Sequence, residues 1–216
     1  YVDISFLSNA GTMEHSKSYT MNAEVSNDKK SIRFTHANMD VTYTLPDHGY
    51  MMNMTLNPSQ ASKSRNLDME WSQHALMTEQ NTKAQKQYIQ LCYNLENEGY
   101  DYHTISDKNT KEMKEGVKWV CFKQHYFNSA LITDNKIITS ARVTTEPNAD
   151  TSQPTQSMVN AYFSVTPQGP LNFKWFLGPN DYSLLKSYRI ELENIIPLSY
   201  GIFGFVKYIN TWIIIP

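Results

Sequence analysis

Alternation of apolar and polar residues is the feature that most constrains what this chain can fold into. Within residues 41–45 the apolar side chains fall on one face and the threonines on the other, and residues 50–56 resume the alternation. The turn-forming stretch Pro46-Asp47-His48-Gly49 separates them. Because successive side chains of a strand point to opposite faces of a sheet, we expect an antiparallel hairpin over residues 41–56.

Four further stretches repeat this two-residue period. Their apolar positions are Leu67, Met69 and Trp71; Ile89, Leu91, Tyr93 and Leu95; Val159, Ala161, Phe163 and Val165; and Leu171, Phe173, Trp175 and Leu177. Residues 146–157, rich in Thr, Ser, Gln and Pro, predict the longest loop. Many short strands without helical segments between them indicate a β-sandwich or barrel and argue against βαβ units.

The pattern changes after Gly178-Pro179. Asn180 or Asp181 can cap a helix, and apolar residues follow at roughly helical spacing until Pro197, which should end the helix. We therefore expect residues 1–177 to form the sandwich and residues 178–216 a C-terminal helical segment.

The last twenty residues carry a single charge, Lys207, and finish in Ile-Ile-Ile-Pro. Aromatic side chains with polar tips favour the membrane–water interface. We expect such an interface at Tyr200, Phe203, Phe205, Tyr208 and Trp212, ahead of a membrane span. A buried C-terminal helix of the sandwich is the alternative.

Charge and composition exclude some classes of function. The chain has 19 basic and 21 acidic residues, for a formal net charge of −2, and its basic residues form no cluster. A nucleic-acid partner is therefore not expected, because such binding depends on a basic patch that neutralises phosphates. Apolar residues make up 40% of the chain, which is enough to bury a core.

His125 is the residue that most invites a catalytic interpretation. It lies among Trp119, Phe122, Tyr126 and Phe127, in a segment that we expect to be a strand. A general base or metal ligand needs a positioned partner, which the local sequence does not supply. A core or sheet histidine is therefore favoured, and we expect no catalytic residue, no cofactor and no metal.

Three other groups of residues leave alternatives open. Asp68 and Glu70 would face the same way on a strand, either as a carboxylate pair for sugar chemistry or, as we favour, as its wet face. Cys92 and Cys121 can form a disulfide only if their strands are neighbours. The ten methionines fill the core or, less often, line an adaptable apolar groove.

Two stretches resemble the YidC-type membrane-protein insertases, and the wording of the C-terminal stretch is most similar to members from the Bacteroidetes. Residues 119–131, WVCFKQHYFNSAL, resemble the W-V-x-x-x-Q-H-Y-F-x-x-A segment of the YidC periplasmic domain. Residues 176–179, FLGP, with the helix and the YGIF at 200–203, resemble its Y/F-x-G-P signature, although Asn180 stands where many members carry Lys. The matching motif positions are Trp119, Gln124, His125, Tyr126, Phe127, Gly178 and Pro179.

The resemblance implies a mainly β fold, an antiparallel β-supersandwich similar to mutarotases with C-terminal α-helices. It implies a periplasm-facing domain of an inner-membrane insertase, with no enzymatic activity and no insertion centre of its own. The implied partners are Sec translocon components (SecD/SecF and SecY), nascent membrane proteins and the inner membrane. The alternative is a sugar-binding or mutarotase-like enzyme domain, which a cleft with converging histidine and carboxylates would favour.

Overall fold

The computed structural model describes residues 2–7, 12–37, 39–58, 67–76, 81, 85, 87–104, 108–114, 116–133, 138–147, 155–165 and 169–197. The chain divides into two compact units, Tyr1–Gly178 and Pro179–Pro216. Each unit is described by itself.

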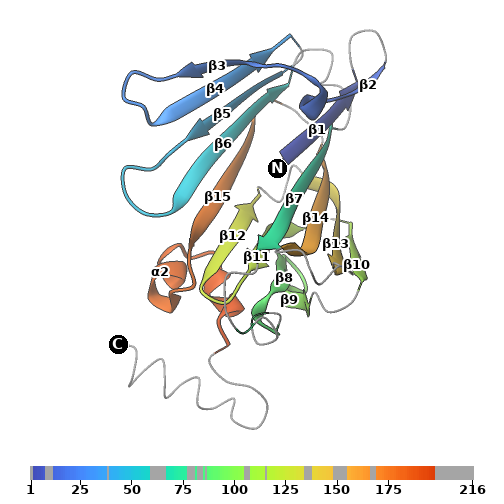
Figure 1. Cartoon of the computed structure of the whole chain (residues 1–216), viewed down its shortest axis with the longest axis vertical. Helices are drawn as coiled ribbons and strands as arrows, with labels where there is room; N and C mark the ends of the chain where they lie inside the picture. The colour runs from blue at the N-terminus through green and yellow to red at the C-terminus, as the bar shows by residue number, and fades with distance from the viewer. Residues whose placement is uncertain are drawn as a thin grey trace. The chain divides into compact units, whose positions relative to one another are not determined.

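The first unit consists of two antiparallel sheets (Figure 1). The nine-stranded sheet has the order β3 (Asn22–Val25), β4 (Ser31–His36), β5 (Met39–Thr44), β6 (Met51–Pro58), β15 (Leu171–Pro179), β12 (Phe127–Ile132), β11 (Val117–Lys123), β8 (Gln90–Leu95) and β9 (Gly99–Thr104). The six-stranded sheet has the order β10 (Asn109–Met113), β13 (Ile138–Pro147), β14 (Thr155–Val165), β7 (Leu67–Leu76), β1 (Val2–Leu7) and β2 (Met13–His15). The 3-10 turn η1 (Ser16–Ser18) directly follows β2 in the chain. The mainly β, sandwich-like architecture expected from the alternation is confirmed.

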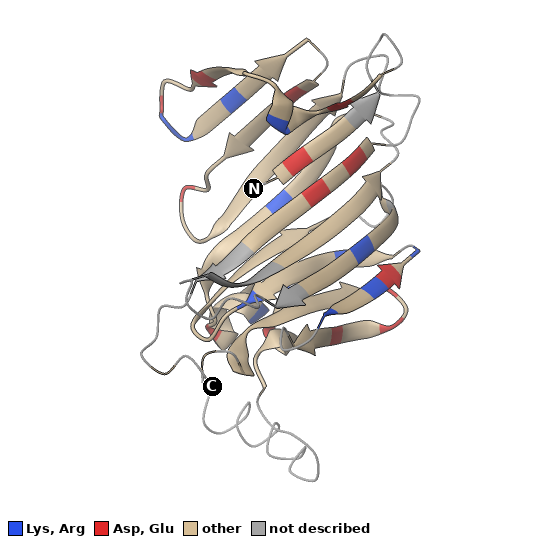
Figure 2. Ribbon diagram, turned by 45° about the vertical axis from the view of Figure 1, so that its right-hand side comes forward, with Lys and Arg blue, Asp and Glu red and all other residues tan. Residues whose placement is uncertain are grey.

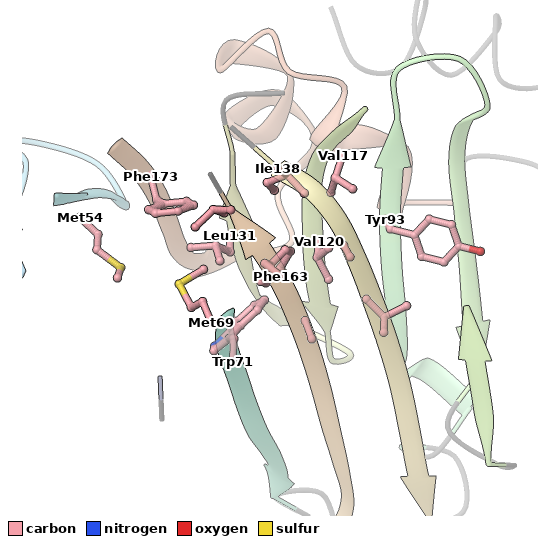
Figure 3. Close-up of a cluster of buried hydrophobic side chains, with 14 of the residues drawn as sticks. Met54, Met69, Trp71, Tyr93, Val117, Val120, Leu131, Ile138, Phe163 and Phe173 are labelled. Atoms are coloured by element: carbon pink, nitrogen blue, oxygen red, sulfur yellow. The ribbon is translucent and has the colours of Figure 1, made fainter. Parts of the chain in front are cut away.

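The core lies between the two sheets and is built from the alternating residues (Figure 3). Trp71 of the six-stranded sheet packs edge-on against Phe122 and Trp175 of the nine-stranded sheet, with ring centroids 5.8 Å apart in both pairs. The predicted hairpin is confirmed, and its register places Val41 opposite Leu56 and Tyr43 opposite Met54. Burying apolar side chains from both sheets is the main favourable term for such a sandwich.

Two expectations from the alternation were wrong. The loop predicted over residues 146–157 is shorter, because β13 continues to Pro147 and β14 begins at Thr155. Leu177, predicted to face the core with Phe173, is 49% exposed, whereas its neighbour Phe176 is fully buried. The alternation identifies the face on which a residue lies, but the opposite sheet no longer covers that face at Leu177.

The second unit begins with a short helix, α2 (Tyr182–Ser187), whose N-cap is Asp181. The Asp181 carboxylate accepts a hydrogen bond from the Leu184 amide at 2.7 Å, as a capping residue should. The single helix predicted as far as Pro197 was wrong, because Arg189 and Glu191 adopt left-handed φ angles of 55° and 64°. After this break, helical structure continues as the 3-10 turn η2 (Leu192–Ile195).

No helix in the described ranges is both long and apolar enough to cross a membrane. The predicted interfacial residues Tyr200, Phe203, Phe205, Tyr208 and Trp212 lie outside the described residues.

Candidate functional site

The motif segment at residues 119–131 forms a hairpin. β11 ends at Lys123, β12 begins at Phe127, and the Gln124 amide donates to the Phe127 carbonyl at 2.9 Å to close the turn. His125 and Tyr126 occupy the centre of this turn, so the expectation that His125 lies in a strand was wrong. The three residues between the strands, Gln124, His125 and Tyr126, include no Gly, Pro or Asn, the residues that usually announce a turn.

The turn carries a stack of aromatic rings. The His125 imidazole lies against Tyr88, with ring centroids 3.9 Å apart and planes 6° apart, and against Tyr126 at 4.0 Å and 26°. Tyr126 and Phe127 are each 61% exposed, whereas Trp119 at the other end of β11 is fully buried. The stack fixes His125 by ring packing and presents aromatic faces at the surface.

The second motif has a packing reason for its glycine. A Cβ atom at Gly178 would lie 2.7 Å from Phe176 Cζ, 2.8 Å from Tyr50 Cγ and 2.9 Å from Tyr50 Cβ, closer than real Cβ contacts. The Leu177 amide also donates to the Tyr50 carbonyl at 3.0 Å, which holds the β5–β6 loop against the end of β15. Only a residue without a side chain fits where Tyr50 crosses this strand.

The fold brings the two motifs together although about fifty residues separate them in the sequence. β15 and β12 are neighbours in the sheet, and the Trp175 indole Nε1 donates to Ser129 Oγ at 2.8 Å. Figure 1 shows β12 and β15 running in opposite directions, so the start of β12 lies beside the end of β15. We call the end of the nine-stranded sheet at which β15 finishes the exit end.

Strands β8 and β11 bury residues on both faces of the nine-stranded sheet. Lys123 is only 5% exposed, and its Nζ donates to Gln90 Oε1 at 3.0 Å. Burial disfavours the ammonium and lowers the pKa of Lys123. Cys92 and Cys121 lie directly opposite each other on the same two strands and are both buried free thiols.

The register meets the condition for a disulfide between Cys92 and Cys121, but the pairing geometry disfavours one. Two hydrogen bonds to the β12 side show which residues of β11 pair with that strand. The Gln124 amide donates to the Phe127 carbonyl, and the Thr133 amide donates to the Lys118 carbonyl, both at 2.9 Å. The alternation of hydrogen-bonded pairs along β11 then directs the backbone groups of Cys121 toward Cys92, which makes them a hydrogen-bonded pair. Cβ atoms in such pairs are about 5.5 Å apart, beyond the roughly 3.5–4.5 Å of a disulfide.

The outer face of the six-stranded sheet carries a groove of about 420 Å³. Figure 2 shows acidic residues on adjacent strands of this sheet. Asp68 and Glu70 face the same way as predicted and line the groove. The polar lining also includes Ser5, His15, Glu112, Ser140, Arg142, Tyr162 and Ser164, none of which was predicted from the sequence as a site residue.

The groove brings a histidine and carboxylates together. Such an arrangement was expected to favour a sugar-binding or mutarotase-like enzyme. The Asp68 carboxylate accepts a hydrogen bond from Ser164 Oγ on the neighbouring strand, and Glu70 accepts one from Ser72 Oγ on its own strand at 3.0 Å. The Arg142 guanidinium lies 4.6 Å from the ring centroid of Tyr162 on the adjacent strand. These contacts are typical of the polar face of a sheet. In the described parts of the chain, no group of His, Cys, Asp and Glu is arranged to hold a metal ion.

A buried carboxylate lies beside the groove. Asp3 is 1% exposed and accepts hydrogen bonds from the Ser16 hydroxyl and the Lys17 amide, both at 3.0 Å, and its Oδ2 lies 3.0 Å from the Lys17 ammonium. His15 Nδ1 is 3.2 Å away. Burial raises the pKa of Asp3, but the Lys17 amide and ammonium outweigh it and hold this pKa below its usual range. The network fastens β1 to β2 and η1.

Comparison with known proteins assigns the chain to a family. The family model described as the YidC periplasmic domain matches residues 1–214. Proteins named membrane protein insertase YidC match it at 25% identity in Parabacteroides distasonis, 27% in Porphyromonas gingivalis and 26% in Amoebophilus asiaticus, covering 83%, 82% and 81% of this chain. The chain spans 30% of the length of each of these relatives.

The solved structures give a much weaker likeness. A GH36 α-galactosidase from Geobacillus stearothermophilus is 9% identical, with a TM-score of 0.41 over 94% of this chain and 33% of its own, and nothing is drawn from it. The order and spacing of the two motifs and the match along nearly the whole sequence agree: the chain belongs to the YidC periplasmic domain family.

Proposed function

We propose that this chain is an accessory domain of an insertase that places proteins in the inner membrane. The supporting observation is the match of the YidC periplasmic domain over residues 1–214, together with relatives that are named membrane protein insertases and are about three times longer. In this proposal the domain itself has no enzymatic activity. It assists insertion and folding of membrane proteins by binding partners or substrate and by coupling to the membrane helices.

The coupling role belongs to the segment at residues 178–216, which we propose leads to a membrane span. β15 continues to Pro179, so the segment is joined covalently to a central strand of the sheet. The packing of Tyr50 on Gly178 and the Leu177–Tyr50 hydrogen bond support this role, because they hold the end of that strand in place within the sandwich.

The partner-binding role belongs to the sandwich. We propose that SecD/SecF, SecY and nascent membrane proteins are its partners, as they are for insertases that work with the Sec translocon. The relatives that are named membrane protein insertase YidC support nascent membrane proteins as one of these partners.

Complementation of a strain depleted of the parent protein tests the proposal. One variant of the parent lacks residues 1–175, and another carries a scrambled sequence at residues 178–207. Insertion of a reporter membrane protein is followed in both. We expect the scrambled segment to abolish insertion and the deletion to weaken it; a lethal deletion beside a harmless scramble would assign the essential role to the sandwich instead.

A matched control uses the Gly169→Ala variant of the parent, because a Cβ at Gly169 meets no atom within 4 Å. It should insert the reporter as the wild type does. Accumulation of each variant in the membrane is measured alongside, so that loss of the protein is not mistaken for loss of function.

A further inference from the structure

The exposed apolar side chains of the sandwich are not scattered. Among the described residues, eight large hydrophobic side chains are exposed, and the strand registers place seven of them, all but Met13, at the exit end. Five of the seven flank the adjacent strands β6, β15, β12, β11 and β8; these residues, which we call the exit patch, are Tyr50, Leu177, Phe127, Tyr126 and Tyr88.

The residues of the exit patch lie at the ends of five consecutive strands. Tyr50 directly precedes β6, Leu177 is near the end of β15, Phe127 begins β12, Tyr126 follows β11, and Tyr88 precedes β8. The registers place these ends at one level: Met51 lies opposite Phe176, and Lys123 opposite both Asn128 and Gln90. With about 4.8 Å between strands, the patch is roughly 19 Å wide.

The core does not extend to this end of the sheet. Phe127 and Leu177 continue the inner-face alternation of β12 and β15, yet they are 61% and 49% exposed. The side chains are therefore not cut off from water by the opposite sheet. Contiguous apolar surfaces on a domain mark binding sites more often than chance exposure does.

We propose that the exit patch lies on the outer surface of the inner membrane and contacts the lipid headgroup and glycerol region. Three of its five residues are tyrosines, whose amphipathic rings are typical of the membrane–water interface. The proposal rests on the proposed function in one respect: Leu177 is two residues from Pro179, where the segment leading to the membrane begins. The strand end nearest the bilayer then also carries the aromatic surface.

The geometry also gives the patch a stiff support. His125 is held between Tyr88 and Tyr126, and Tyr50 is held on Gly178, so three of the rings are already fixed before contact. Side chains ordered in advance lose little conformational entropy on binding. The domain would then rest on the membrane in one orientation instead of swinging freely on its connecting segment.

Flotation of the chain with vesicles is the first test. Residues 1–216 are mixed with vesicles of phosphatidylethanolamine and phosphatidylglycerol, and the bound fraction is measured for the wild type, Tyr126→Ser/Phe127→Ser and the control Met13→Ser. Met13 is 55% exposed on the six-stranded sheet, outside the patch. We expect the double variant to bind about tenfold less or weaker still, which needs only about 1.4 kcal/mol of lost contact, with circular dichroism and Tm unchanged. Equal binding by all three proteins, or an equal loss in Met13→Ser, overturns the proposal.

The second test uses the parent chain in proteoliposomes, with a fluorophore at Tyr126→Cys or at Met13→Cys and a nitroxide quencher on the shallow part of the lipid chains. Quenching at 126 and none at 13 is expected. A blue-shifted but unquenched label at 126 overturns the proposal, because it means that protein covers the patch. Normal reporter insertion without quenching at 126 refutes this inference alone, whereas a parent that never supports insertion refutes the proposed function instead.

Discussion

Substitution of Gly178 by alanine tests most directly whether Tyr50 packs tightly on the end of β15. The three close atoms would have to retreat from 2.7–2.9 Å to an ordinary contact of at least 3.4 Å. Tyr50 Cβ cannot rotate away, because it is attached to a backbone whose carbonyl accepts the Leu177 amide. Relief therefore requires the loop to shift and that hydrogen bond to weaken.

The magnitude follows from these two costs. Overpacking of this kind costs about 1–3 kcal/mol, and a hydrogen bond contributes about 1 kcal/mol. We expect Gly178→Ala to lower the free energy of unfolding by about 2–3 kcal/mol. For a chain of this size that corresponds to a fall in Tm of about 4–12 °C.

Urea unfolding followed by circular dichroism measures this loss against the control Gly169→Ala. A Cβ at Gly169 meets open space, so the control should be neutral or slightly stabilising. In a Tyr50→Ala background one of the three close atoms is absent, and Gly178→Ala should cost less there. If Gly178→Ala and Gly169→Ala unfold alike, close packing is not what requires glycine at this position.

Three further predictions concern the interior and the surface. Cys92 and Cys121 should remain reduced and be alkylated by iodoacetamide only in urea, because burial raises the pKa of Cys92 to about 12 and that of Cys121 well above its usual value. A chain that takes up no alkyl group in urea without reductant, and that is two hydrogen atoms lighter than the reduced chain, would instead reveal a disulfide. Asp3→Asn should cost about 1.5–3 kcal/mol at pH 7, the range for hydrogen bonds to a charged group, and less in acid, because a lowered carboxyl pKa stabilises the fold above the unfolded value of 3.8 and loses this effect as the pH falls through the folded pKa; an equal cost at neutral and at acidic pH in urea titrations would contradict this. Phe127→Ser should change the unfolding free energy by less than about 0.5 kcal/mol, whereas Phe122→Ala, at a 1% exposed core position, should lower it by about 3–5 kcal/mol.

Local signals in the sequence were sufficient for β5, β6, β7, β8, β14 and β15 and for the hairpin at residues 41–56, but they did not identify β1 to β4, β9, β10 or β13. The alternation at residues 41–56 fixed both the pairing and the buried face, because a shift by one residue would turn every apolar side chain to water. Asp181 was one of the two predicted caps, and the structure selects it through its bond to the Leu184 amide. Such features depend on neighbours within a few residues, which a single sequence contains.

Features that depend on distant segments could not be read in this way. The helix break at Arg189 and Glu191 uses left-handed backbone at residues that rarely adopt it, so no local signal announces it. The burial of both faces of β8 likewise depends on more than the alternation within β8. That alternation predicts that Leu91 and Tyr93 are buried, but Cys92 between them is buried to the same extent. The Gln90–Lys123 contact depends on a register between strands that are about thirty residues apart in the sequence.

The same distinction separates residues that shape the exit end from residues available for contact. Gly178 and His125 each have a packing reason in this chain, one beneath Tyr50 and the other between two tyrosine rings. Phe127 and Leu177 have no comparable reason, because both are substantially exposed and a polar residue would leave the core intact. Exposing apolar side chains to water gains the isolated domain nothing, so their value must come from what they contact. A surface supported by Gly178 and His125, and composed of apolar side chains that the core does not need, is therefore where the function of this sandwich should be sought.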